Sequence, residues 1–141
     1  MIAEAVEVYE GNQARGWNCG ASAGEGLSRT LATELYPKQL DGFASASRWL
    51  NSSRTDWVSK IKPTDSDYES IGCSVLFLNW LHVQLGHSWD EIAQAAGSTL
   101  EKTYKRLTKK SGAFTPFRQL LDRQFPPGTP VHLTNDNPFP L

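Results

Sequence analysis

Three glutamates near the start of the chain could do chemistry if the fold brings them together. Glu4 and Glu7 lie in the segment 1–13, where apolar residues recur at helical spacing, and Glu25 begins a second expected helix, about 25–36. Carboxylate oxygens are the ligands that a hard cation such as calcium prefers. The three residues therefore form a candidate calcium site, with ordinary solvent-exposed glutamates as the simpler alternative.

The two segments that carry these glutamates resemble the metal-binding helices of gluzincin-type zincin metallopeptidases. The first reads Ala3-Glu4-Ala5-Val6-Glu7 and the second opens Gly24-Glu25-Gly26-Leu27. The family pattern is His-Glu-x-x-His, followed later by a Glu in an Asn-Glu-Gly-Leu-like turn. The resemblance implies that Glu4 is the general base, that Glu7 replaces the second histidine, and that Glu25 is the third ligand.

Both histidines of the zincin pattern are replaced in this chain, by Ala3 and Glu7. Ala3 has no donor atom, and a carboxylate-only site suits hard cations, which activate water less strongly than zinc does. The resemblance therefore implies a degenerate, non-catalytic zincin-like helical domain. The segment 70–81 looks like the buried helix of the helical subdomain in uncharacterised bacterial proteins of this kind, which implies that the chain is part of a larger protein.

The histidines and cysteines form no recognisable motif. His82, His87 and His132 contain no pair at the spacing i, i+4, so no helical face presents two imidazoles. Cys19 and Cys73 are not part of a Cys-x-x-Cys pair, which excludes a zinc site built from thiolates. The two cysteines would form one disulfide in an exported protein, or remain as two small buried thiols.

Three tryptophans fall in or beside expected loops and are candidate binding residues. Trp17 lies in the glycine-rich loop before the second helix, and Trp49 and Trp57 lie in the long connection 38–64. Exposed aromatic side chains gathered on one surface favour the binding of a partner. The interpretation is a groove for a peptide or a carbohydrate.

The apolar periodicity predicts an all-α fold with a compact bundle of about six helices, since no segment alternates long enough to indicate a strand. The segment of about 67–86 is apolar nearly all round, which predicts a central buried helix. The connection 38–64 carries too many large apolar residues for a solvated loop, and we expect it to pack on the core, with a short helix near 45–51.

The second half of the chain contains clear start signals for helices. Two capping boxes, Ser88–Glu91 and Ser98–Glu101, predict helices at about 89–96 and 99–109, and a final helix is expected at about 113–124. Five of the eight prolines follow position 125. We therefore expect one helical domain, 1–125, and an extended proline-rich tail, 126–141.

Composition narrows the classes of partner. The formal net charge is −1, which excludes a nucleic-acid binder that works by bulk charge. The longest apolar stretch, 71–81, is too short to span a bilayer. The first residues do not have the pattern of a signal peptide, whereas the aromatic-rich composition fits an exported domain. Secretion as part of a longer precursor is one interpretation.

Three functions stay open from the sequence. The first is the non-catalytic zincin-like helical domain, and the second is a metal-dependent, peptidase-like hydrolase with Glu4 as general base. The third is a helical binding module with an aromatic groove. No cofactor is expected for the first, and zinc or calcium are the metals that the glutamates would bind. We expect no zinc-dependent peptidase activity, because both imidazole positions are lost.

Overall fold

A computed structural model describes residues 16–141, so the expected helix 1–13, with Glu4 and Glu7, lies outside the described residues. The described part is helical and contains no strand, which confirms the all-α expectation. It holds six α-helices and one π-helical turn: α2 (Ser22–Leu35), α3 (Ala44–Leu50), α4 (Tyr68–Asn79), η1 (Trp80–Gln84), α5 (Trp89–Gln94), α6 (Leu100–Thr108) and α7 (Phe114–Gln124).

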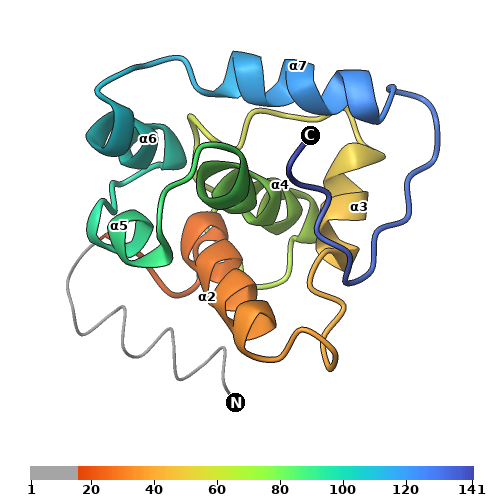
Figure 1. The fold of residues 1–141 in the computed structure, drawn as a ribbon, viewed down its shortest axis with the longest axis horizontal. Helices are drawn as coiled ribbons and strands as arrows, with labels where there is room; N and C mark the ends of the chain where they lie inside the picture. The colour runs from red at the N-terminus through yellow and green to blue at the C-terminus, as the bar shows by residue number, and fades with distance from the viewer. Residues whose placement is uncertain (1–15) are drawn as a thin grey trace.

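The helix α4 is the centre of the fold, as its apolar sequence predicts. Every residue from Ser70 to Asn79 is buried. In Figure 1, α2 and α3 flank α4, and α7 crosses above it. The expected helix of about 67–86 is divided, because α4 passes into the π-turn η1, where the Leu85 amide donates to the Trp80 carbonyl.

Small residues let α2 and α3 approach α4 closely. A Cβ atom added at Gly72 would lie 2.1 Å from the Ser45 carbonyl oxygen on α3. A Cβ atom added at Gly26 on α2 would lie 2.4 Å from the Ser74 Cβ. Glycine is therefore required at both crossings, and it fixes the distance between the backbones that border the site described below.

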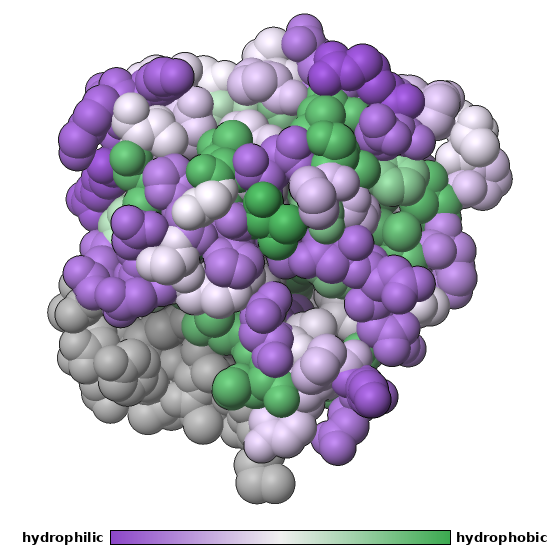
Figure 2. Space-filling view, viewed as in Figure 1, coloured by the Kyte–Doolittle hydropathy of each residue, from purple (hydrophilic) through white to green (hydrophobic). Residues whose placement is uncertain are grey.

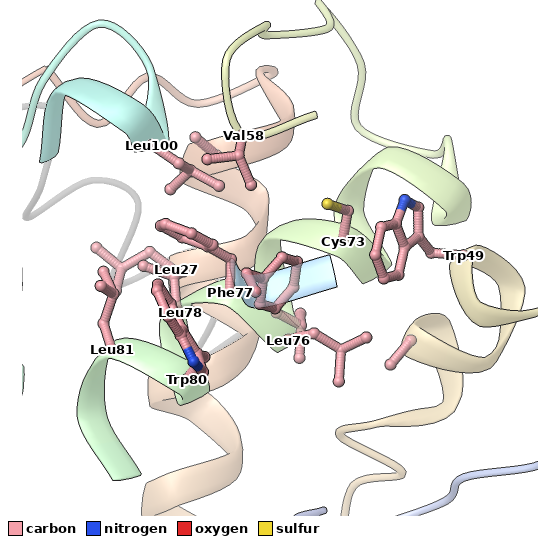
Figure 3. Packing of buried hydrophobic residues seen from close by; sticks show 14 of the residues in the cluster. Leu27, Trp49, Val58, Cys73, Leu76, Phe77, Leu78, Trp80, Leu81 and Leu100 are labelled. Carbon is pink, nitrogen blue, oxygen red and sulfur yellow. The ribbon is translucent and has the colours of Figure 1, made fainter. Parts of the chain in front are cut away.

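Aromatic side chains from several elements fill the core around α4. Phe117 of α7 lies 5.6 Å from Trp49 of α3 and 5.2 Å from Phe77 of α4, measured between ring centroids. Trp80 stacks on Tyr104 of α6 at 5.8 Å. Figure 3 shows side chains from separate elements converging on this cluster. On the face in Figure 2, apolar residues reach the surface only in small groups between polar ones.

The long connection packs on the core, as expected. Its helix α3 spans Ala44–Leu50, one residue from the expected 45–51. Val58 is fully buried, and Trp57 and Ile61 pack against the core cluster.

The proline-rich segment lies along α3 (Figure 1), and its last residue contacts η1. Asn51 exchanges two hydrogen bonds with the Val131 backbone, of 2.7 and 2.8 Å. Gln84 does the same with Leu141, at 2.8 and 2.6 Å. Phe139 is buried in the core cluster. The division into a domain, 1–125, and a tail stays a prediction.

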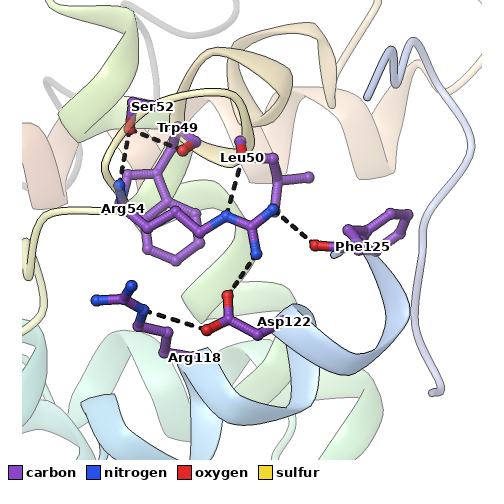
Figure 4. Close-up of polar contacts among 7 residues, drawn as sticks. All are labelled: Trp49, Leu50, Ser52, Arg54, Arg118, Asp122 and Phe125. Carbon is purple, nitrogen blue, oxygen red and sulfur yellow. Dashed lines mark hydrogen bonds and ion pairs between the residues drawn. The ribbon is translucent and has the colours of Figure 1, made fainter. Parts of the chain in front are cut away.

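A buried arginine joins the end of α3 to the end of α7 (Figure 4). Arg54 is 1% exposed and pairs with Asp122, while its Nε donates to the Leu50 carbonyl at 3.0 Å. Its Nη2 donates to the Phe125 carbonyl at 2.7 Å. A buried guanidinium needs such partners because desolvating an unpaired charge is costly. These contacts give Arg54 a structural role that the sequence pattern did not indicate.

One of the two expected capping boxes forms and the other does not. The Ser88 hydroxyl accepts from the Glu91 amide and the Glu91 carboxylate accepts from the Ser88 amide, as expected. The N-cap of α6 is Thr99 rather than Ser98, so the predicted second capping box is wrong and the helix begins one residue later than that box requires. The Glu101 carboxylate accepts instead from the Gly112 and Ala113 amides at the start of α7.

Candidate functional site

Glu25 is buried in the first turn of α2, which begins three residues before the expected start. Its Oε1 accepts a 3.1 Å hydrogen bond from the Gly20 amide, and its Oε2 lies 3.8 Å from the Arg29 guanidinium. The carboxylate thus holds the preceding loop to α2, and the arginine charge beside it opposes the binding of a cation. The distance from Glu25 to Glu4 and Glu7 lies outside the described residues.

The other metal-binding and nucleophilic side chains do not gather. Within residues 16–141, no group of three His, Cys, Asp or Glu residues could hold a metal ion. His82 stacks on Trp89 with ring centroids 4.2 Å apart, and its Nδ1 lies 2.7 Å from the His87 carbonyl oxygen. Cys19 is at the surface, Cys73 is buried, and no disulfide joins the two. Burial raises the pKa of the Cys73 thiol, which keeps it protonated and unreactive.

The three candidate tryptophans do not surround an open groove. Trp17 is 3% exposed and Trp49 is fully buried. Their indole nitrogens donate to the Ala93 and Thr55 carbonyls, each at 2.9 Å. Trp57 is half-buried, and the Lys62 ammonium lies 5.5 Å from the centroid of its ring. Trp17 and Trp49 therefore support the core and present no open face to a ligand.

A groove of about 410 Å³ lies instead between α2 and α3. Pro37 follows the end of α2, and the chain turns back through 38–43 towards α3. At Gly42 an added Cβ would lie 2.4 Å from the Thr33 side chain, so glycine lets this segment pass close to α2. The groove is lined by Arg29, Ala32, Thr33, Leu40, Asp41, Gly42, Ala44, Ser45, Arg48 and Tyr68.

The rim of the groove carries exposed apolar side chains. Leu40 is 41% exposed and Tyr68 is 47% exposed. Leu35 and Tyr36, where α2 ends, are also exposed, at 65% and 40%, but they do not line the groove. Exposed apolar groups beside a hollow mark a surface at which a partner can be bound. The sequence pattern missed this site, since only the way α2 and α3 lie against each other brings these residues together.

Two arginines lie on opposite walls of the groove and differ in their contacts. Arg29 is held by Glu25, by the Asp65 carbonyl at 3.4 Å and by the Tyr68 ring, whose centroid lies 5.5 Å away. Its Nε is buried and has no hydrogen-bond partner within residues 16–141. Arg48 is exposed on α3, and no described residue pairs with its guanidinium. Among the described residues, the groove therefore carries one arginine that its neighbours hold in place, Arg29, and one whose guanidinium is unpaired, Arg48.

No family model, curated protein or solved structure matches this chain. The zincin-like resemblance accordingly stays a prediction. No helix among residues 16–141 has both the length and the apolar character needed to cross a membrane.

Proposed function

We propose that the chain is a helical binding domain and that the groove between α2 and α3 takes a peptide. The observation that carries the proposal is the groove itself, a hollow of about 410 Å³ with Leu40 and Tyr68 exposed at its rim. Small-ligand sites are mostly apolar hollows of about 300–1,000 Å³ with a few polar groups. A hollow at the low end of that range suits one or two residues of a peptide.

A peptide fits the groove better than a carbohydrate does. A sugar ring stacks on an open aromatic face, and Tyr68, the one aromatic residue that lines the groove within 16–141, has the Arg29 guanidinium over its ring. A peptide needs an apolar contact for a side chain and polar groups for its backbone. Ala32 and Leu40 offer the apolar contact, while the Ser45 hydroxyl and the Asp41 carboxylate offer polar groups for the peptide backbone.

The binding function is tested with an array of synthetic hexapeptides and the full chain. We expect a subset of peptides to bind, with affinity that falls at least tenfold in Leu40→Asp, because a charge replaces the apolar rim. Leu35→Asp is the matched control, since Leu35 is exposed on α2 but does not line the groove. Thermal melts of both variants separate lost binding from lost folding.

Two results would count against this function. In the first, no hexapeptide binds the folded wild-type chain. In the second, Leu40→Asp and Leu35→Asp bind the selected peptides equally well. Either result would show that the groove is not a peptide site.

A second proposal keeps the zincin-like resemblance and its non-catalytic reading. Its support is the buried position of Glu25 in the first turn of α2, where the resemblance implies the third ligand. The contact of Glu25 with Arg29 favours a site that has lost its metal. The test is the metal content of protein purified without chelator, with cleavage of a mixed peptide library in added zinc. Stoichiometric zinc, or cleavage that disappears in Glu4→Gln, would contradict the non-catalytic reading.

A further inference from the structure

We infer that the groove between α2 and α3 recognises the C-terminal end of a peptide, with Arg48 binding the terminal carboxylate and the rim holding an apolar last side chain. The inference rests on the proposed peptide-binding function and adds the chemistry that selects the ligand. It is argued from the charges around the groove and from how each of them is already paired.

The guanidinium N–H groups of Arg48 are available to bind a ligand. Arg48 lies on α3, it is exposed, and no residue within 16–141 forms a hydrogen bond or ion pair with its side chain. The helix beneath it is held firmly, because the Ser45 backbone lies directly against Gly72 of α4. A guanidinium on a fixed helix can donate two parallel hydrogen bonds to one carboxylate.

Arg29 gives the opposite wall a fixed positive charge. Its guanidinium is held near Glu25 and over Tyr68, so it does not have to be ordered when a ligand enters. Its Nε is buried and has no hydrogen-bond partner among the described residues. The charge of Arg29 therefore attracts an anion into the groove, and Arg48 forms the direct hydrogen bonds with it.

The charge balance favours a ligand with a single negative charge. Among the described residues, two arginines and one aspartate, Asp41, line the groove, and Glu25 partly neutralises Arg29. A second hollow shares Arg48 and Tyr68 and is bordered by the acidic Asp67 and Glu69. A doubly charged phosphate would meet these acids, whereas one carboxylate matches the available arginine.

A peptide C-terminus is the carboxylate source that the shape favours. In a last residue such as leucine, the carboxylate and the apolar side chain leave the same Cα atom. The groove likewise places Arg48 beside the apolar residues Ala32, Leu40 and Ala44 within one hollow of about 410 Å³. Asp41, which has no side-chain partner within residues 16–141, can accept from a backbone amide of the peptide.

The experiment compares two forms of each peptide that the hexapeptide array selects, using the full chain. One form has a free C-terminal carboxylate and the other a C-terminal amide, both labelled at the N-terminus for fluorescence polarisation. We expect the free acid to bind about tenfold more tightly than the amide, as one charge-assisted contact warrants. Added salt should reduce the difference.

Variants assign the difference to Arg48. In Arg48→Gln the acid and the amide should bind equally, and Arg48→Lys should restore part of the preference through its charge. Arg123→Gln is the control, because it removes the same charge from an exposed site on α7 that is not part of the groove. Thermal melts of all three variants establish that they are folded.

Each other outcome overturns the inference in a recognisable way. Equal binding of acid and amide by the wild type would show that the groove does not recognise the C-terminal carboxylate, while the proposed peptide function would stand. A preference that follows an internal Asp or Glu, and that Arg48→Gln abolishes, would contradict the C-terminal assignment. Competition by inorganic phosphate at equal concentration would contradict the single charge. Failure of both forms to bind would reject the peptide function as well.

Discussion

Gly72 offers the sharpest test of how the fold positions the groove. Alanine at this site would place a Cβ atom 2.1 Å from the Ser45 carbonyl oxygen and 2.6 Å from the Ser45 carbonyl carbon. Ordinary contact needs about 3.4 Å, so α3 must move away from α4 by about 1 Å or more. The obstacle is backbone, which cannot turn aside as a side chain would.

Two effects of opposite sign set the size of the loss in Gly72→Ala. Alanine is the better helix former by up to about 1 kcal/mol. Overpacking a close helix contact costs about 1–3 kcal/mol, and a backbone obstacle places this site at the upper end. We therefore expect a net loss of about 2 kcal/mol in the free energy of unfolding, which lowers Tm by about 7 °C in a chain of this size.

Urea denaturation followed by circular dichroism measures the change. Gln119→Ala, at an exposed position on α7, is the control and should stay within about 0.5 kcal/mol of the wild type. Because α3 carries Arg48, Gly72→Ala should also weaken binding of the selected peptides. A Gly72→Ala chain as stable as the wild type would refute the close crossing of α3 and α4.

Three further changes probe the core, the buried arginine and a surface ion pair. Leu78→Ala removes a fully buried side chain from α4 and should cost about 2–5 kcal/mol in denaturant melts, whereas a loss near zero would place the core elsewhere. Asp122→Asn removes the negative charge that pairs with the buried guanidinium of Arg54 and should cost about 2 kcal/mol in the same assay. A cost of less than about 0.5 kcal/mol, as for an exposed ion pair, would contradict a structural role for the Arg54–Asp122 pair. The Lys62 ammonium holds the pKa of the Asp67 carboxyl below its ordinary value of 3.8, so this pair stabilises the fold above that value and the stabilisation is lost as pH falls through the lower folded pKa. Asp67→Asn should therefore reduce stability near pH 7 by less than about 1 kcal/mol, with the two unfolding curves converging in acid, and a difference that persists in acid would implicate another interaction.

The helices could be predicted closely because their signals are local. The apolar surface of α4 indicated its burial, and Ser88 with Glu91 indicated the start of α5. The same reasoning failed at α6, where two adjacent hydroxyl residues compete to be the cap. Thr99 takes that position, and Glu101 turns to amides that lie eleven and twelve residues further along the chain. A local pattern cannot register a partner that only the folded chain brings near.

The tryptophans show that a local pattern is equally unable to predict which candidate binding residues are exposed. The apolar content of 38–64 indicated that this connection packs on the core, but it did not indicate which aromatic faces are covered. Trp49 is buried because α7 returns across α3 and brings Phe117 onto its ring. The groove depends equally on non-local features, since Arg29, Leu40 and Arg48 belong to separate elements.

The candidate site is coupled to the core because α3 has only seven residues, too few to be stable as an isolated helix. Its position comes from the residues that flank Arg48 in the sequence. Trp49 enters the aromatic core, and the Ser47 hydroxyl accepts from the Leu133 amide at 2.6 Å. Those contacts leave Arg48 as the outward-facing residue between two anchored neighbours. The proposed contact of Arg48 with a ligand therefore depends on one short helix, which the core holds from one side and the proline-rich segment from the other.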